Sequence, residues 1–116
     1  MYYIYMIRCK DNSIYTGITT NLEKRLREHL TRDKNCAKYT YVHIAKKLEV
    51  AWKTETRALA SKLEYYIKKL KREEKESLIK SSRNFSLLLD EKIDTTCYTC
   101  MGKKELSKVK KRVCEK

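Results

Sequence analysis

Two tyrosines and a glycine near the amino terminus have the types and spacing of residues that can do chemistry. Tyr5 and Tyr15 lie ten residues apart, and Gly17, the only glycine before residue 102, follows them in a stretch with strand composition. Glycine inside a strand often marks close approach of another backbone or of a ligand. Phenolic hydroxyls on a shared sheet face can position or transfer a proton at such a place. Taken alone, the tyrosine pair is more often ordinary cross-strand packing.

Arg25, His29 and Glu64 add the charges that hydrolysis of a phosphodiester bond needs. Arginine clamps phosphate oxygens through two parallel hydrogen bonds and keeps its charge. Glutamate supplies a hard oxygen ligand, and magnesium commonly uses one or two carboxylates while keeping several waters. Histidine can relay a proton. Each residue also has an ordinary reading: a surface arginine, an edge histidine, and a glutamate paired with Lys68 four residues later.

A β-hairpin and a helix must position all of these residues except Glu64. Tyr2–Arg8 and Ser13–Thr19 are rich in aromatic and β-branched residues, and the polar segment between them predicts a short turn. Thr20 and Glu23 form a capping-box pattern that begins a helix. Leucines recur every four residues from Leu22, so this helix should run to about residue 32.

Further elements are expected along the remaining chain. In order, they are a loop over 33–41, a strand over Ala45–Lys53, a helix capped by Thr56, and a short basic helix over Glu73–Lys80. The apolar stripe of the Thr56-capped helix is Leu59, Leu63, Ile67 and Leu70. Arg25 and Glu64 each lie about 60° from the apolar stripe of their helix, where a side chain can lean toward the sheet and still meet solvent.

These elements predict an α+β fold, a small three-stranded antiparallel sheet flanked by helices in the order β-β-α-β-α-α. We expect residues 1–81 to form this domain. We expect residues 82–116 to form a basic C-terminal extension, helical or partly disordered, in which Phe85–Leu89 is an apolar packing patch or a short helix.

The ordered set of motifs resembles the GIY-YIG nuclease family, and is most similar to its small, standalone bacterial branch. Tyr3-Ile4-Tyr5 and Tyr15-Thr16-Gly17 resemble the two halves of the signature, although the family name has Gly at the position of Tyr3 and Ile at that of Thr16. The run from Asn21 to His29 resembles the first helix of the family. The run from Leu63 to Leu70 resembles the segment with the metal-binding glutamate.

The resemblance implies a divalent-metal-dependent endonuclease that uses magnesium or manganese. It implies Tyr5, Tyr15, Arg25, His29 and Glu64 as catalytic residues, with Glu64 as the metal ligand. Several relatives carry a late Asn or Gln near the phosphate, for which Asn84 is a candidate here. The alternative is a nucleic-acid-binding module that kept the fold and lost turnover. A weaker third interpretation is an accessory protein that docks a partner through Phe85–Leu89.

Charge favours the same class of partner. The 116 residues include 28 Lys and Arg against 15 Asp and Glu, a net charge of +13 that is not confined to the C-terminal part. Such an excess favours a polyanion rather than a small-molecule substrate or a membrane, although a lysine-rich solvated surface is the alternative. Together with the resemblance, it implies DNA as the partner, with branched or damaged structures as candidates. The predicted nucleic-acid contacts are Gly17, Lys24, Arg27, Lys38, Tyr39, Lys68 and Lys69, with ordinary loop packing and solvated helix charges as alternatives for the last four.

Cysteine usage and hydropathy bear on the compartment. The five cysteines lack the even number and spacing of a disulfide framework, and we interpret them as reduced thiols in a cytoplasmic protein. Cys97-x-x-Cys100 has the spacing of half a zinc site, but the tail supplies no histidine and only Cys114 as a further thiol. Free thiols are therefore the favoured interpretation. No stretch of sequence approaches the length of a membrane span.

Overall fold

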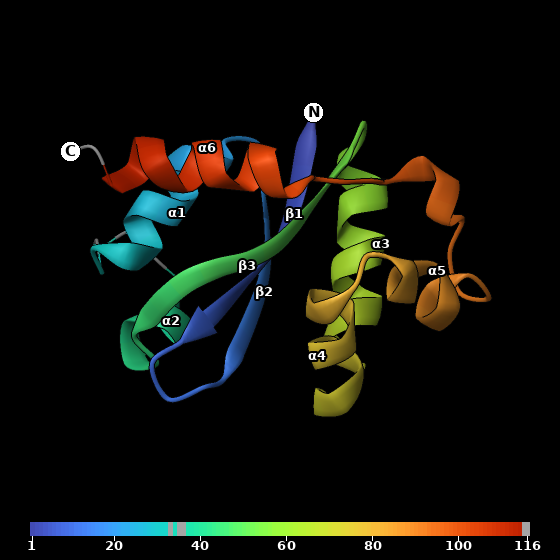
Figure 1. Ribbon diagram of the computed structural model, residues 1–116, viewed down its shortest axis with the longest axis horizontal. Helices are drawn as coiled ribbons and strands as arrows, with labels where there is room; N and C mark the ends of the chain where they lie inside the picture. Colours follow the sequence, from blue (N-terminus) through green and yellow to red (C-terminus); the bar gives the residue numbers. More distant parts are fainter. Residues whose placement is uncertain (33, 35–36, 115–116) are drawn as a thin grey trace.

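The computed structural model describes residues 1–32, 34 and 37–114, which form a curved sheet with helices packed on both of its faces (Figure 1). The strands are β1 (Tyr2–Cys9), β2 (Ile14–Thr19), β3 (Ala45–Thr54) and β4 (Thr99–Cys100). The helices are α1 (Leu22–Leu30), α2 (Lys38–Val42), α3 (Arg57–Lys68), α4 (Arg72–Lys80), α5 (Arg83–Leu89) and α6 (Lys103–Cys114), with a 3₁₀ turn over Thr95–Cys97.

The sheet confirms the predicted hairpin and gains one strand. Its order is β2-β1-β3-β4, with every neighbouring pair antiparallel. Asn12 adopts a positive φ of 71° in the β1–β2 turn, a conformation that asparagine tolerates better than most residues. The prediction of three strands was one short, because the two residues of β4 come from the C-terminal extension and pair beside Trp52 of β3.

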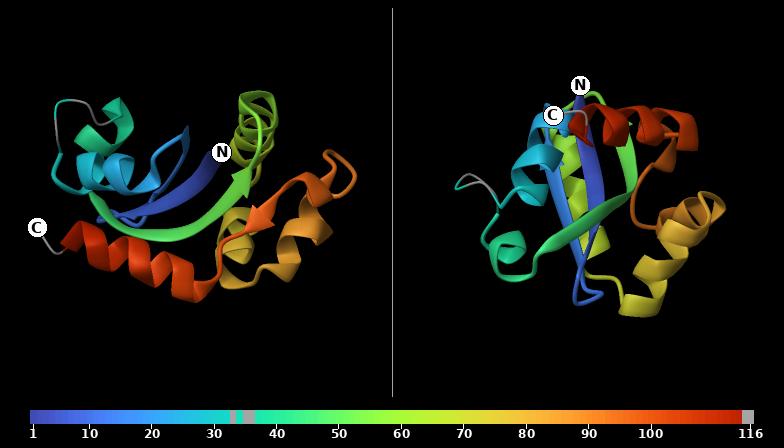
Figure 2. Two further views of the ribbon diagram at one scale, coloured as in Figure 1. Left: turned by 90° about the horizontal axis from the view of Figure 1, so that it is seen from above. Right: turned by 60° about the vertical axis from the view of Figure 1, so that its left-hand side comes forward.

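Alternation along β1 divides the apolar residues between two cores. Ile4 and Met6 point to one face, where they pack with α3, α4 and α5. Tyr5 and Ile7 point to the other face, where they pack with α1 and α6. Figure 2 (left) shows α3, α4 and α5 gathered at one side of the curved sheet and α1, α2 and α6 at the other. The residues with candidate chemistry on β1, β2 and α1 therefore belong to the second core.

Two predictions about the first helix were wrong. The N-cap of α1 is Asn21, whose Oδ1 accepts a hydrogen bond from Lys24 N at 3.1 Å, and not Thr20. The helix ends at Leu30, because Arg32 takes a positive φ of 53° that an α-helix cannot continue. By contrast, Thr56 caps α3 as predicted, accepting from Leu59 N at 3.2 Å.

The segment predicted as a loop over 33–41 contains the start of a short helix. Residues 33, 35 and 36, Cys36 among them, lie outside the described residues. From Lys38 the chain forms α2, which ends at Val42 and buries Thr40. This correction matters because α2 brings Thr40 beside α1.

The C-terminal extension is helical and packs on both cores. Phe85 and Leu89 of α5 join the core under α3, whereas Leu106 and Val109 of α6 join the core beside α1. The division of the chain into a domain over residues 1–81 and an extension over residues 82–116 stays a prediction. Among the described residues, no helix combines the length and the apolarity that crossing a bilayer demands.

Candidate active site

Gly17 makes room for the hydroxyl of Tyr5. The two residues are directly opposite in the β1–β2 register, and their side-chain positions share one face. A Cβ built at Gly17 would lie 2.6 Å from Tyr5 Oη and 3.0 Å from Tyr15 Cε2, closer than real Cβ contacts. The glycine marks close approach, but the approaching group is the phenol of Tyr5 and not the backbone or ligand that the sequence predicted.

Four aromatic rings follow one another from this point. The ring centroids of Tyr5 and Tyr15 are 6.2 Å apart, which confirms that both rings share a face. Tyr15 stacks on Tyr39 of α2 at 5.6 Å, and Tyr39 stacks on His43 at 4.3 Å. Tyr39, predicted to stack on bases, is thus engaged with two rings of the protein itself.

A chain of hydrogen bonds leads from Tyr5 into α2. Tyr5 Oη lies 2.8 Å from His29 Nε2, and His29 Nδ1 lies 2.6 Å from Thr40 Oγ1. The Thr40 hydroxyl donates its one proton to the carbonyl of Ala37 at 3.1 Å, since a carbonyl only accepts. Thr40 must therefore accept from His29 Nδ1–H, which leaves Nε2 as the acceptor of the Tyr5 proton. The network selects one tautomer of His29.

Burial keeps this pair uncharged. His29 is 0% exposed and Tyr5 is 1% exposed. Burial, aided by the charge of Arg25, lowers the pKa of His29 to about 4. Burial and the neighbouring Tyr15 raise the pKa of Tyr5 above its ordinary value, and a hydrogen bond from Arg25 only partly opposes them. At neutral pH the site holds a neutral phenol and a neutral imidazole.

Arg25 lies at the margin of the site, as its helical position predicts. Its Nη1 donates to Glu28 Oε1 at 2.8 Å, and its guanidinium lies near enough to Tyr5 to lower the pKa of that phenol. The side chain keeps 25% of its surface exposed. A guanidinium held in this way combines a fixed position with access to solvent.

Glu64 approaches the same site from α3, which packs against β2. Its negative charge contributes to the raised pKa of Tyr5, so the carboxylate acts electrostatically on that phenol. Glu64 Oε2 lies 3.4 Å from Lys68 Nζ, and Lys68 Nζ lies 5.8 Å from the Tyr15 ring centroid. Two phenols, a guanidinium, an imidazole and a carboxylate are thus brought together from β1, β2, α1 and α3.

The donor set suits a loosely held hard cation. Glu64 is half-buried with 25% of its side-chain surface exposed. In the described part of the chain, no three His, Cys, Asp or Glu side chains are grouped closely enough to enclose a metal ion. One accessible carboxylate fits magnesium or manganese that takes its remaining oxygen ligands from water and phosphate.

The other residues predicted to contact nucleic acid are spread over α1, the start of α2 and the end of α3. Lys24 and Lys38 are exposed at the surface of α1 and at the start of α2. Lys69 Nζ lies 4.5 Å from the Tyr65 ring centroid. Arg27 is half-buried, and its Nε is buried without a hydrogen-bond partner among the described residues. Nucleic-acid contacts by these residues stay predictions.

Thr40 and Glu28 were not predicted from the sequence as residues of the site. Glu28 stands three residues after Arg25, a helical spacing that could have identified it as the arginine's partner. Thr40 lies in a segment without periodicity, so no local pattern pointed to it. Asn84, the candidate late amide, donates to Ser77 O at 2.7 Å and so joins α5 to α4.

Comparison with known proteins identifies the family of this chain. The GIY-YIG catalytic domain family matches residues 1–77. The chain belongs to the GIY-YIG family. A GIY-YIG catalytic domain implies a nuclease-type function, and residues 78–114 lie beyond the matched region.

Several relatives of this GIY-YIG chain are small bacterial proteins whose names specify no activity. UPF0213 protein YazA of Bacillus subtilis (strain 168) is 42% identical over 83 residues, covering 72% of this chain and 82% of the relative. UPF0213 protein CPE1444 of Clostridium perfringens is 46% identical over 82 residues, covering 70% and 85%. The solution NMR structure of UPF0213 protein BH0048 from Bacillus halodurans is 33% identical, with a TM-score of 0.45, covering 76% of this chain and 97% of that one.

Proposed function

We propose that this GIY-YIG protein is a divalent-metal-dependent endonuclease that hydrolyses phosphodiester bonds in DNA, with branched or damaged DNA as candidate substrates in repair or recombination. The observation that supports the proposal most is the hydrogen-bonded pair of Tyr5 and His29, with Arg25 and Glu64 both acting on the pKa of that phenol. Proton transfer and charge neutralisation are the two things that phosphodiester hydrolysis asks of a protein.

Tyr5 and His29 are arranged to accept a proton in sequence. The proton of Tyr5 Oη points to His29 Nε2 over 2.8 Å, which frees the phenolic oxygen to accept a proton from an attacking water. In a concerted transfer, Tyr5 passes one proton to His29 as it receives another. His29 is then the net base, and Tyr5 carries the transfer to the reacting atoms.

Arg25 and Glu64 provide for the charge of the phosphate. The partly exposed guanidinium can bind two phosphate oxygens while Glu28 holds its other edge. Glu64 would hold the magnesium or manganese ion, which when bound supplies neutralisation of negative charge on the phosphate. Tyr15, between Tyr5 and Tyr39, would orient the substrate at the mouth of the site.

Substrate binding would change the pKa values of both groups. Without substrate, the low pKa of His29 and the high pKa of Tyr5 oppose proton transfer. A phosphate anion near Arg25 would offset the positive charge that lowers the pKa of His29, and it would offset the influence of Arg25 on the pKa of Tyr5 as well. A cation held at Glu64 would oppose the influence of that carboxylate, which raises the pKa of Tyr5. The phosphate would therefore make His29 a stronger base, while the cation limits the rise in the pKa of Tyr5.

Nicking of supercoiled plasmid and of branched DNA, with magnesium, manganese or EDTA, tests the proposal. Glu64→Ala and Arg25→Ala should each reduce the rate at least about 100-fold, because each removes electrostatic stabilisation of the transition state. Glu91→Ala, at an exposed position after α5, is the matched control and should cleave normally. Wild-type rates from both site variants would refute the assignment.

A binding module without turnover is the second candidate, and one observation favours it. Tyr5 is only 1% exposed, which limits its contact with a water molecule. This function requires salt-sensitive DNA binding with no cleavage in either metal. The same nicking assay, run beside a binding measurement, separates the two candidates.

A further inference from the structure

A groove runs away from the candidate active site along the outer edge of β2. One hollow of about 330 Å³ is lined by Ile14, Tyr15, Thr16, Tyr39, Lys68 and Lys75. A second hollow of about 190 Å³ is lined by Ser13, Ile14, Tyr39, Arg72 and Lys75. The two share three lining residues, so they form one continuous groove, which we call the β2 groove. Figure 1 shows the end of the β1–β2 hairpin between α2 and α4, the helices that supply its walls.

The β2 groove begins at the reacting groups. Tyr15 lines its inner end, and Lys68 links Tyr15 to Glu64 through contacts of 5.8 and 3.4 Å. The described sheet ends at β2, so the groove follows a strand whose outer edge is not paired within the sheet. Whatever chain of atoms lies in the groove therefore continues directly into the candidate active site.

Lys75 is the charge in the groove that lacks a counter-ion. It is half-buried on α4, lines both hollows, and forms no ion pair with any residue that the structure describes. Arg72, by contrast, is held by Asn12 O at 2.6 Å and by Glu76 at 3.3 Å. A half-buried ammonium group without a carboxylate is most stable when an anion binds beside it.

Thr16 adds a second group in need of a partner. It lines the inner hollow and is 3% exposed, and its Oγ1 has no hydrogen-bond partner among the described residues. That oxygen exposes less than 1 Å², so a phosphate in the hollow would reach it only after a shift of the Thr16 side chain. The charge of the inner hollow therefore comes from Lys68 and Lys75.

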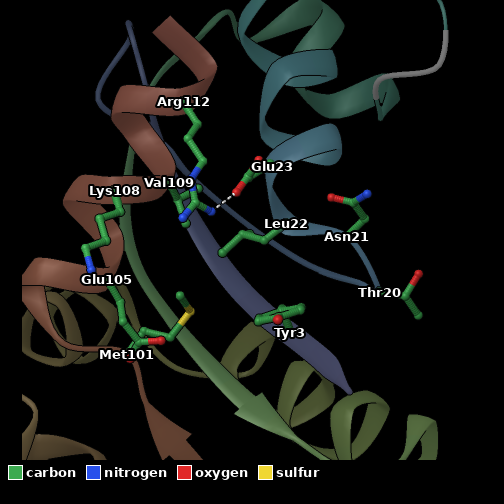
Figure 3. A pocket seen from close by; sticks show the side chains of 10 residues that line it. All are labelled: Tyr3, Thr20, Asn21, Leu22, Glu23, Met101, Glu105, Lys108, Val109 and Arg112. Atoms are coloured by element: carbon green, nitrogen blue, oxygen red, sulfur yellow. Dashed lines mark hydrogen bonds and ion pairs between the residues drawn. The ribbon is translucent and has the colours of Figure 1, made fainter. Parts of the chain in front are cut away.

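Another hollow of similar size lacks these features. About 400 Å³ lies between α1 and α6, lined partly by Glu23, Glu105 and Arg112 (Figure 3). Arg112 forms an ion pair with Glu23, and Glu105 pairs with Lys53, whereas Lys108, a further lining residue, is exposed and forms no ion pair with a described residue. Two carboxylates in the lining make this hollow less favourable for a polyanion than the β2 groove.

We propose that the β2 groove binds the sugar-phosphate backbone of the strand being cut, on one side of the scissile bond, and that Lys75 contacts a phosphate in it. The proposal rests on the nuclease function proposed above. It assigns a binding role to α4, which had no predicted role at the site, and it gives the strand one direction of exit from Tyr15, toward the hairpin turn.

Binding of a fluorescein-labelled DNA duplex, measured by anisotropy in EDTA over a series of NaCl concentrations, tests the proposal without turnover. Loss of one phosphate contact reduces the slope of log Kobs against log [NaCl] by about 0.9, which at 0.1 M salt is about an 8-fold loss of affinity. Full-length Lys75→Gln should show both changes. Lys75→Arg, which keeps the charge, should retain most of the wild-type slope.

Lys80→Gln is the matched control, because Lys80 is an exposed lysine on the same helix outside the β2 groove. It should leave slope and affinity nearly unchanged, and thermal melting should show all three variants folded. Equal slopes for Lys75→Gln and wild type, or an equal loss in Lys80→Gln, would overturn the groove assignment. Normal groove binding by a protein that never cleaves would instead sink only the nuclease function.

Discussion

The Thr40→Val substitution tests whether Thr40 determines the tautomer of His29. Valine keeps the branched shape of threonine but removes Oγ1, the acceptor 2.6 Å from His29 Nδ1. The position is 0% exposed, so water cannot readily replace the hydroxyl. The Nδ1–H tautomer then carries a buried donor without a partner, which costs about 1–3 kcal/mol. That cost shifts the tautomer equilibrium about 5- to 160-fold toward Nε2–H.

The shifted tautomer reverses the hydrogen bond to Tyr5. With its proton on Nε2, His29 donates to the phenolic oxygen and can no longer accept the Tyr5 proton. Long-range ¹H–¹⁵N correlation spectra of the histidine ring report the tautomer directly, and plasmid nicking reports the rate. We expect Nδ1–H in the wild type, Nε2–H in Thr40→Val, and a cleavage rate reduced by a factor within the same range.

Thr40→Ser is the matched control, since serine keeps the acceptor and should restore both the spectrum and the rate. A Thr40→Val protein that retained the Nδ1–H tautomer would show that Thr40 does not position His29. A changed tautomer with an undiminished rate would show that His29 is not the base.

Two further predictions concern stability. Gly17→Ala should lower the free energy of unfolding by about 1–3 kcal/mol and impair nicking, because the new Cβ overlaps Tyr5 Oη. Chemical denaturation measures this loss, and Gly102→Ala, where nothing lies within 4 Å of the added Cβ, is the comparison. Equal stabilities of the two variants would contradict the overlap. His29 has a pKa of about 4 in the folded protein against an ordinary value of 6.5. Between these two pH values the unfolded chain binds a proton that the folded chain does not. The free energy of unfolding should therefore fall, by up to about 3 kcal/mol, as the pH drops from about 6.5 to about 4. Urea denaturation across this range, compared with His29→Gln, checks it, and an unchanged slope in the variant would refute it.

Local pattern predicted those parts of the fold that local interactions determine. The hairpin and β3 follow from β-branched and aromatic runs, and the Thr56 cap and apolar stripe of α3 follow from helical spacing. At the start of α1, Thr20 and Asn21 are adjacent residues that both suit an N-cap, and asparagine is the better of the two. The cap is Asn21, whose Oδ1 accepts from Lys24 N. The capping-box spacing of Thr20 and Glu23 therefore favoured the wrong one of two neighbouring residues.

Elements fixed by distant contacts were the ones missed. The two residues of β4 are a strand only because they pair with β3, and α2 is only five residues long, packed beside α1 through Thr40. For the site, the shared sheet face of Tyr5 and Tyr15 followed from strand parity, and the approach of Arg25 followed from helical phase. Thr40 could not be found in this way, because its role depends on a buried contact between segments without shared periodicity.

Because Gly17 lies directly opposite Tyr5, a tyrosine at position 5 restricts which residues position 17 can accept. While a phenol occupies position 5, a methyl group at position 17 collides with it, and once position 17 has acquired a side chain, the phenol can return only after that side chain is lost. Position 17 therefore cannot gain a side chain while Tyr5 is kept, and a library that randomises Gly17 in the wild-type background will sample mostly damaged proteins. Alternatives to glycine at this corner of the sheet are reachable only together with a change at position 5.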